Sequence, residues 1–150
     1  LIDWDWLSDG TPGRFHGDFH FENILWSEQE KKITFLDWRQ DFAEDLSVGD
    51  IYYDLAKLMH GLIVNHGVIA NNQFEASWSD TEINFRLKFK KELLECKEIF
   101  ENWLSKNGYD VMKVRVLTAL IYLNIAALHH YPYSILLYGL GKQMLHEEYL

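Results

Sequence analysis

Apolar residues at helical spacing fill most of the chain after residue 50, and this feature constrains the fold more than any other. The first such stripe consists of Ile51, Leu55, Leu58, Met59, Leu62 and Ile63. A three- or four-residue spacing of this kind places one apolar face along an α-helix. Asp50 comes directly before the stripe and is a suitable N-cap residue. We therefore predict a helix that begins after Asp50.

Three more helices are expected in the remainder of the chain. The second has an apolar stripe formed by Phe85, Phe89, Leu93, Cys96, Phe100 and Trp103. It should end at Asn107-Gly108, and the stripe predicts that Cys96 is a buried small apolar residue. Asp110 can cap a third helix that runs to about His130, where Tyr131-Pro132 breaks it. A fourth helix is expected over roughly 133 to 148, and the polar stretch 67 to 82 is predicted to be a surface loop.

The first third of the chain has a different pattern. Two short β-prone runs, "NILW" and "ITFLDW", are separated by the charged turn "SEQEKK", which predicts a hairpin. Residues 1–13 form a short segment that ends in the turn signal "DGTPG", and residues 39–49 are acidic and irregular. The predicted fold class is α+β and mainly α-helical: a polar loop and a small β hairpin followed by about four helices, in a single domain over residues 1–150.

Composition excludes several classes of function. A chain of 150 residues suits one domain with a proper core, and a formal net charge of -9 argues against a nucleic-acid partner. No apolar run reaches the roughly 20 residues of a membrane span, so no membrane partner is expected. The single cysteine excludes an internal disulfide and fits a reducing compartment. We therefore expect a cytoplasmic protein.

The segment "RFHGDFHFENILW", residues 14–26, concentrates the polar groups that could perform chemistry. Phosphoryl transfer requires a carboxylate near the attacking hydroxyl, and an amide with a second carboxylate to hold Mg²⁺. The spacing typical of such sites is H-x-D, an Asn five residues after the Asp, and a hairpin that carries a further Asp. The chain supplies His16, Asp18 and Asn23, and then Asp37 at the end of the predicted hairpin.

Two other interpretations remain open. In the first, His16, Asp18 and His20 at alternating positions bind zinc or iron in a metal-dependent hydrolase, with Asp37 as a further ligand. That interpretation leaves Asn23 and the later segment "GDIYYDLAKL" unexplained. In the second, the chain is a non-catalytic relative that only binds a ligand, although the intact set of three polar positions argues against this.

Three segments resemble one known family. "HGDFHFENIL", "FLDWRQ" and "GDIYYDLAKL", within about residues 14 to 58, are similar to the C-terminal lobe of the aminoglycoside phosphotransferase and choline kinase family, which has a protein-kinase-like fold. The resemblance implies that Asp18 is the catalytic aspartate, that Asn23 and Asp37 bind Mg²⁺, and that ATP or GTP is the phosphoryl donor. Phe19 stands where the family commonly has Leu, and Ile51 where it commonly has Pro; neither change removes a chemical group.

Several neighbouring residues are expected to support this loop. The resemblance implies that His16 braces the loop through hydrogen bonds, and Gly17 permits a tight backbone. His20 either approaches the phosphate or the substrate, or supports the loop. Asp50 is expected to cap the helix, and Asp54, one turn later, to form hydrogen bonds back to the catalytic loop.

The acceptor implied by the resemblance is a small hydroxyl compound: an aminoglycoside, choline or ethanolamine, an amino acid or a sugar. In the family it lies between the catalytic loop and the C-terminal helices. The residues predicted for its pocket are acidic or aromatic, namely Trp38, Glu44, Asp45, Trp78, Tyr122 and Tyr131. Acidic and aromatic groups together favour a cationic acceptor; a sugar-type metabolite is a close alternative.

A kinase also needs a nucleotide-binding lobe, which precedes the catalytic loop and carries a lysine for the phosphates. Before Asp18 this chain has one basic residue, Arg14, and no lysine, and it begins without methionine. We therefore expect that this chain is a C-terminal lobe from which the N-terminal, nucleotide-binding lobe is missing. That N-terminal lobe of the same protein is its expected partner. The 150-residue chain by itself is expected to be inactive, or nearly so, as a kinase.

Overall fold

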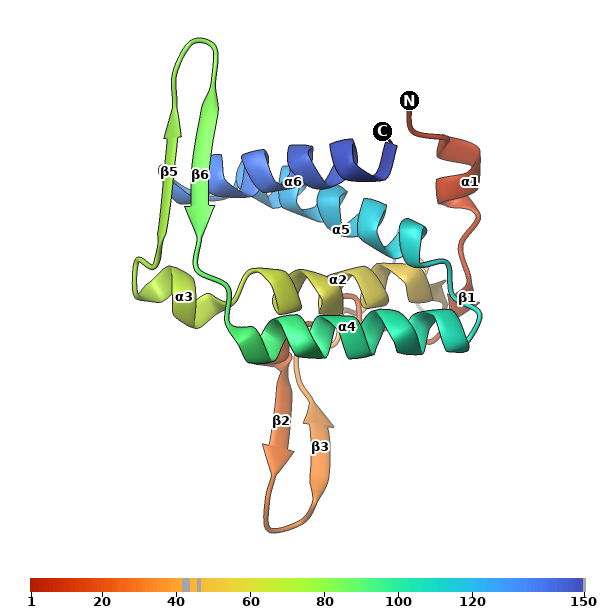
Figure 1. Ribbon diagram of the computed structural model, residues 1–150. Coiled ribbons are helices and arrows are strands. Elements are labelled where there is room, and N and C mark those ends of the chain that lie inside the picture. Colours follow the sequence, from red (N-terminus) through yellow and green to blue (C-terminus); the bar gives the residue numbers. More distant parts are fainter. Residues whose placement is uncertain (42–43, 46, 150) are drawn as a thin grey trace.

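Four long helices lie alongside one another and form the body of the protein in a computed structural model that describes residues 1–41, 44–45 and 47–149 (Figure 1). They are α2 (Ile51–Ile63), α4 (Lys91–Lys106), α5 (Val111–Ala126) and α6 (Tyr133–Tyr149). The short elements α1 (Trp4–Ser8), η1 (Phe21–Asn23) and α3 (His66–Ala70) lie in the connections. The strands are β1 (Pro12–Gly13), β2 (Ile24–Ser27), β3 (Lys32–Phe35), β4 (Gly49–Asp50), β5 (Phe74–Trp78) and β6 (Ile83–Leu87).

Side-chain caps explain where two of the long helices begin. Asp50 Oδ1 accepts hydrogen bonds from the backbone N–H of Tyr52 at 3.0 Å and of Thr11 at 2.9 Å. Asp50 therefore caps α2, as predicted, and also holds the segment before β1. Asp110 caps α5 by accepting from the N–H of Lys113 at 3.2 Å, which satisfies a donor in the first turn that has no partner within the helix. Helix α5 ends at Ala126, a few residues before the predicted end.

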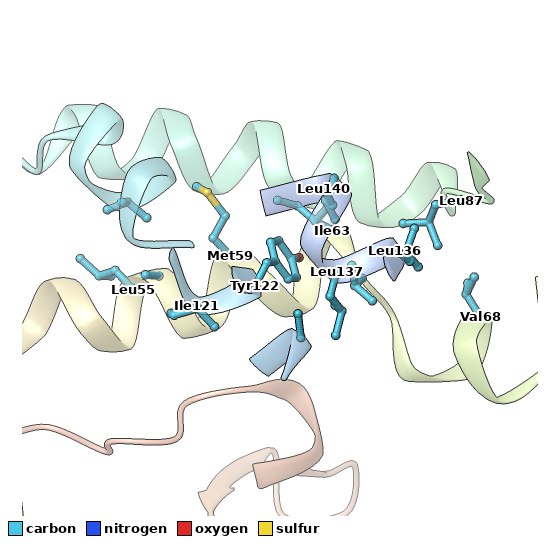
Figure 2. Close-up of a cluster of buried hydrophobic side chains, with 14 of the residues drawn as sticks. Leu55, Met59, Ile63, Val68, Leu87, Ile121, Tyr122, Leu136, Leu137 and Leu140 are labelled. Atoms are coloured by element: carbon cyan, nitrogen blue, oxygen red, sulfur yellow. The ribbon is translucent and has the colours of Figure 1, made fainter. Parts of the chain in front are cut away.

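The hydrophobic core lies where α2, α5 and α6 meet (Figure 2). Met59, Tyr122, Leu136 and Leu137 have no exposed surface, and Tyr122 donates its hydroxyl to the carbonyl of His60 at 2.7 Å. The hydrogen bond satisfies a hydroxyl that burial would otherwise make unfavourable. Tyr122 is therefore a core residue that connects α5 to α2.

Two strand pairs frame the polar loop. Strand β1 pairs antiparallel with β4, and β2 pairs antiparallel with β3 from Ile24 opposite Phe35 to Ser27 opposite Lys32. The β2–β3 hairpin is the predicted one, and it extends away from the helices in Figure 1. The loop between β1 and β2 is consequently held against the beginning of α2.

The predicted surface loop over residues 67–82 is wrong. This region contains α3, β5 and the turn of a second hairpin, in which Phe74 lies opposite Leu87 and Trp78 opposite Ile83. Inward-facing residues of this hairpin, Phe74, Ala76 and Phe85, pack against the core. Each strand has only five residues, and the alternation of apolar and polar residues over so short a length does not distinguish a strand from a polar loop.

The second predicted helix begins later than expected. Phe85 lies in β6 and Phe89 precedes α4, which begins at Lys91. The four-residue spacing of Phe85, Phe89 and Leu93 imitated a helical stripe across a strand and a connection. Cys96 is exposed rather than buried, because α4 turns that side toward solvent.

The length and composition of the helices show whether any of them could span a membrane. Within residues 1–41, 44–45 and 47–149, none of the helices combines the length and the apolar character that crossing a membrane requires.

Candidate functional site

Asp54 fixes the loop that contains Asp18 to the first turn of α2. Its carboxylate accepts hydrogen bonds from two consecutive backbone N–H groups, that of His16 at 2.5 Å and that of Gly17 at 2.8 Å. Asp54 is buried, and charge-assisted bonds of this kind are stronger than neutral ones. The predicted contact between Asp54 and the loop is confirmed.

His16 and Gly17 determine the shape of the loop, as predicted. His16 is buried; its Nδ1 accepts from the N–H of Asp18 at 3.3 Å, and its ring lies 4.8 Å from the ring of Trp38. Gly17 has φ +80, and a Cβ there would lie 2.6 Å from Cβ of Arg39. Both the backbone conformation and the lack of space therefore require glycine at this position.

Asp18 lies at the end of this turn with 29% of its side chain exposed. Its Oδ1 lies 2.8 Å from Nζ of Lys57, and its Oδ2 lies 3.3 Å from Nε2 of His20. Partial burial by itself raises the pKa of Asp18, but the hydrogen bond and charge of Lys57, together with His20, outweigh burial and leave the pKa below its ordinary value. Asp18 is thus an ionised carboxylate near neutral pH.

Lys57 is a further residue of this site, which the sequence motifs did not identify. It lies on α2 three residues after Asp54, and only 12% of its side chain is exposed. Residues three apart on a helix share a face, so an Asp54 that faces the loop implies that Lys57 also faces it. That spacing within "YYDLAKL" was the available signal.

Hydrogen bonds made by Asn23, and by Leu36 and Arg39 on either side of Asp37, join the hairpin to the loop. Asn23 donates its Nδ2 to the carbonyl of Asp18 at 2.9 Å, and its own carbonyl accepts from the N–H of Leu36, also at 2.9 Å. On the far side of Asp37, the N–H of Arg39 donates to the carbonyl of His16 at 2.8 Å. The backbone of Asp37 is thereby placed beside the loop that contains Asp18.

The backbone of Asp37 is itself unusual. Its φ of +51 is in the left-handed region, which a non-glycine residue rarely occupies. Strain of this kind concentrates at functional sites, where the surrounding structure enforces it. The exposed Asp37 carboxylate forms no hydrogen bond or ion pair with the residues that the structure describes.

These residues suit magnesium better than zinc. The described ranges contain no group of three or more His, Cys, Asp or Glu side chains that could hold a metal ion. Mg²⁺ needs no such group, because one or two protein oxygens are completed by phosphate oxygens and water. Because the Asn23 amide nitrogen bonds to Asp18, its amide oxygen is left for another partner, and Asp37 offers a carboxylate. Asn23 and Asp37 therefore each offer a side-chain oxygen of the kind that Mg²⁺ prefers, and their role as its ligands stays a prediction.

The hydrolase interpretation is not supported by the position of His16. The His16 ring packs against Trp38 and Phe19, and its Nε2 is buried without a hydrogen-bond partner. His20 instead faces Asp18 and Glu22, with Nδ1 2.7 Å from Glu22 Oε2. The two histidines consequently do not converge with Asp18 on one ion.

A cavity of about 550 Å³ opens beside Asp18. It is enclosed by the loop that contains Asp18, the second half of α2, the start of α3 and the junction of α5 and α6. Its lining includes Asp18, His20, Phe21, Glu22, Lys57, His60, Asn65, His66, His129 and Tyr133. This location, between the loop and the later helices, is the one that was expected for an acceptor.

The six residues predicted for an acceptor pocket do not line this cavity. Tyr122 is in the core, and Trp78 lines a separate cavity near the turn of the β5–β6 hairpin. Trp38 lies against His16, and Tyr131 is exposed at 68%. Glu44 and Asp45 are exposed, and Asp45 accepts from the N–H groups of Ser47 and Val48. The prediction relied on residue type alone, whereas the place of each residue in the fold decides which side chains line the cavity.

The loop, the β2–β3 hairpin and α2 bring Asp18, Asn23 and Lys57 together. The family model described as the phosphotransferase enzyme family (APH) matches residues 1–86, more than half of the chain. The chain belongs to this family, which confirms the predicted resemblance to the aminoglycoside phosphotransferases and choline kinases. Searches of curated proteins and of solved structures found no match.

Proposed function

We propose that the protein transfers the γ-phosphoryl group of ATP or GTP to a hydroxyl group of a small acceptor. The observation that carries the proposal is the position of Asp18, on a loop that Asp54 fixes and that Asn23 and the backbone of Asp37 adjoin. A carboxylate, an amide and a second carboxylate are the groups that phosphoryl transfer requires. Membership of the phosphotransferase family supports the same reaction.

Asp18 would orient the acceptor and receive its proton. The hydroxyl oxygen forms a bond to the γ-phosphorus, the bond from that phosphorus to the β–γ bridging oxygen breaks, and the hydroxyl proton passes to Asp18. Because Lys57 lies 2.8 Å from Oδ1, the carboxylate starts the reaction ionised and held in one orientation.

Asn23 and Asp37 would hold Mg²⁺ through their side-chain oxygens. When bound, Mg²⁺ neutralises charge that develops on the phosphate oxygens. Asp37, with its left-handed backbone, lies where the hairpin meets the loop. The hydrogen bonds of Leu36 and Arg39 hold these two segments together.

The proposal includes a nucleotide-binding lobe that packs on the β2–β3 hairpin. All four residues of β3 are exposed, and Leu25, Trp26 and Ile33 each expose more than half of their surface, at 52%, 54% and 52%. Large exposed apolar groups gathered on one element mark a surface for a partner. We therefore propose that this chain is a C-terminal lobe with little turnover of its own. The proposal also includes a cytoplasmic location, since a single cysteine fits a reducing compartment.

The test is phosphoryl transfer by the complete protein with Mg²⁺ and ATP or GTP, followed by ³¹P NMR over a panel of hydroxyl compounds. Asp18→Asn should lower the turnover number about 10²- to 10⁴-fold while Mg-nucleotide binding remains, because only the proton acceptor is lost. Asp37→Asn should weaken Mg-nucleotide binding. Asp80→Asn, in the exposed turn between β5 and β6, is the matched control. Full turnover in Asp18→Asn would refute the proposal, and binding without any transfer would favour the non-catalytic relative.

A further inference from the structure

We propose that helix α4 carries a docking surface for a second copy of the protein, and that two copies pair through antiparallel α4 helices about a two-fold axis. The surface is a stripe along the solvent side of α4, and none of its members lines the cavity beside Asp18. This outer stripe consists of Glu92, Cys96, Ile99, Trp103 and Lys106, all of which are exposed.

The outer stripe is separate from the face that α4 turns toward the body of the protein. Helix α4 packs mainly against α2, at the opposite side of the body from α6 (Figure 1). Its inward face contains Leu93, Phe100 and Leu104, which are partly or fully buried. On a helix with 3.6 residues per turn, the outer stripe is turned by about 120° from this inward face. The packing of the chain on itself therefore leaves the outer stripe uncovered.

The spacing of the outer stripe is that of a coiled-coil seam. Its five members follow one another at intervals of four, three, four and three residues. Intervals that average 3.5 residues keep one stripe turned toward a partner helix along its whole length. The middle of the stripe is apolar, with Ile99 exposed at 68% and Trp103 at 46%, and exposed apolar groups gathered in this way mark an interaction surface. The partner that fits this stripe is another helix.

Trp103 is held in position before a partner binds. Its ring stacks on the rings of Phe100 and Tyr109, with centroid distances of 6.2 and 5.7 Å. A side chain that is already ordered loses little conformational freedom on binding, and Trp is a frequent anchor at the centre of protein interfaces. Trp103 is therefore suited to carry much of the contact.

The charges at the two ends of the outer stripe identify the partner and its direction. Glu92 lies at the N-terminal end and Lys106 at the C-terminal end, and neither forms an ion pair within the part of the chain that the structure describes. Ile99 lies midway, seven residues from each. An antiparallel second copy centred on Ile99 therefore places Glu92 opposite Lys106 of that copy at both ends. A parallel copy would place like charges opposite each other, which opposes binding.

The same alignment matches the apolar part of the stripe to itself. Ile99 meets Ile99 of the second copy at the two-fold axis, and Cys96 lies close to Trp103 of the second copy. Glu95, which flanks Ile99, is already paired with Lys91 of the same helix at 3.5 Å. Because both copies use the same surface, the contact closes at two copies and does not extend into a filament.

Sedimentation velocity of the complete protein over a range of concentrations measures this pairing. We expect a monomer–dimer equilibrium. Ile99→Glu should raise the dissociation constant of the dimer at least about tenfold, because it places two carboxylates together at the two-fold axis. Leu128→Glu, which changes another exposed apolar residue at the end of α5, is the control and should leave the dimer unchanged. Circular dichroism of both variants checks that they remain folded.

Charge reversal tests the antiparallel direction. Glu92→Lys and Lys106→Glu should each weaken the dimer severalfold, because each variant places like charges together at both ends of the contact. The double variant restores opposite charges and should dimerise nearly as well as the unchanged protein. Glu98→Lys, at an exposed position on another side of α4, is the matched control and should leave the dimer unchanged.

The outcomes separate this surface from the proposed reaction. A protein that stays monomeric up to its solubility limit would overturn the proposed pairing, as would a dimer that Ile99→Glu leaves intact or that the double charge reversal does not restore. Loss of Mg-nucleotide binding in Ile99→Glu without any dimer would also overturn it, because the nucleotide-binding lobe would then cover the stripe. A dimer with the expected variant pattern but without phosphoryl transfer would support the pairing and count against the proposed function.

Discussion

At the scale of single residues, the site depends on groups that fix the loop rather than on Asp18 alone. Asp54 accepts two backbone hydrogen bonds, and Lys57 from the same face of α2 reaches Asp18. Both contacts come from the helix that follows the loop by about thirty residues in the chain, so the orientation of Asp18 depends on a helix that itself belongs to the core. Gly17 is the other constraint, because it lets the chain turn between these contacts.

Gly17→Ala and Gly108→Ala provide a matched comparison of this constraint. Both glycines have positive φ, +80 and +78, but a Cβ at Gly17 would meet Arg39, whereas a Cβ at Gly108 meets nothing within 4 Å. The backbone conformation alone costs about 1–2 kcal/mol for a residue with a side chain. Because overlap adds about 1–3 kcal/mol, Gly17→Ala should lower the free energy of unfolding, measured in urea, by the larger amount.

An equal loss of stability in the two variants would show that Arg39 moves aside freely. In that case the contact between Arg39 and Gly17 would not hold the loop, and phosphoryl transfer in Gly17→Ala should be close to normal.

At the scale of elements, the two hairpins have different surroundings. The β5–β6 hairpin packs Phe85 against Gly139 of α6, and the β2–β3 hairpin extends from the body with β3 wholly exposed (Figure 1). A sequence pattern of alternating residues cannot report this difference, because it depends on what covers each face. The helices were easier to predict, since Asp50 and Asp110 cap them through local hydrogen bonds.

Trp26→Ser and Ile33→Ser test whether the β2–β3 hairpin contacts the proposed nucleotide-binding lobe. Both side chains are more than half exposed, so the substitutions should change the stability of this 150-residue chain by less than about 0.5 kcal/mol. In the complete protein they should weaken Mg-nucleotide binding, measured by calorimetry, because an apolar contact is lost. Leu128→Ser, exposed at 75% at the end of α5, is the control and should leave nucleotide binding unchanged.

Unchanged nucleotide binding in both hairpin variants would mean that the exposed hairpin has another role. A comparable loss in Leu128→Ser would show that the assay responds to any exposed apolar substitution.

At the scale of the whole molecule, the core and the candidate site share one helix. Leu55 and Met59 of α2 belong to the core cluster drawn in Figure 2, and Asp54 and Lys57 of the same helix face the loop that contains Asp18. His60 lies between the two surfaces, with its ring 5.0 Å from that of Tyr122 and beside the cavity. Its ionisation is therefore coupled to folding.

His60 should make the protein less stable in acid. Burial, with the charge of Lys57, lowers its pKa from 6.5 to about 4, so between these pH values the unfolded chain binds a proton that the folded chain does not. Stability should therefore fall as the pH falls from about 6.5 to 4, by up to about 3 kcal/mol from this group. His60→Gln should remove that part of the pH dependence in urea unfolding, whereas His146→Gln, at an exposed position, should retain it.

A pH profile of His60→Gln identical to that of the unchanged protein would contradict the prediction. The remaining acid sensitivity should come from carboxylates such as Glu101. Partial burial raises the pKa of Glu101, but Arg115 and Lys97 lower it by more, so its pKa lies below the ordinary value.

The local features of this protein follow from residues that lie close together in the sequence. Helix ends followed from Asp50 and Asp110, the first hairpin from two short β-prone runs, and the phosphotransferase family from the spacing of Asp18, Asn23 and Asp37, because each depends on neighbours in the chain. Which distant side chains meet depends instead on how the helices and hairpins pack. Lys57 reaches Asp18, Tyr122 enters the core, and the β5–β6 hairpin covers α6 because helix packing, and not local spacing, brings these residues together.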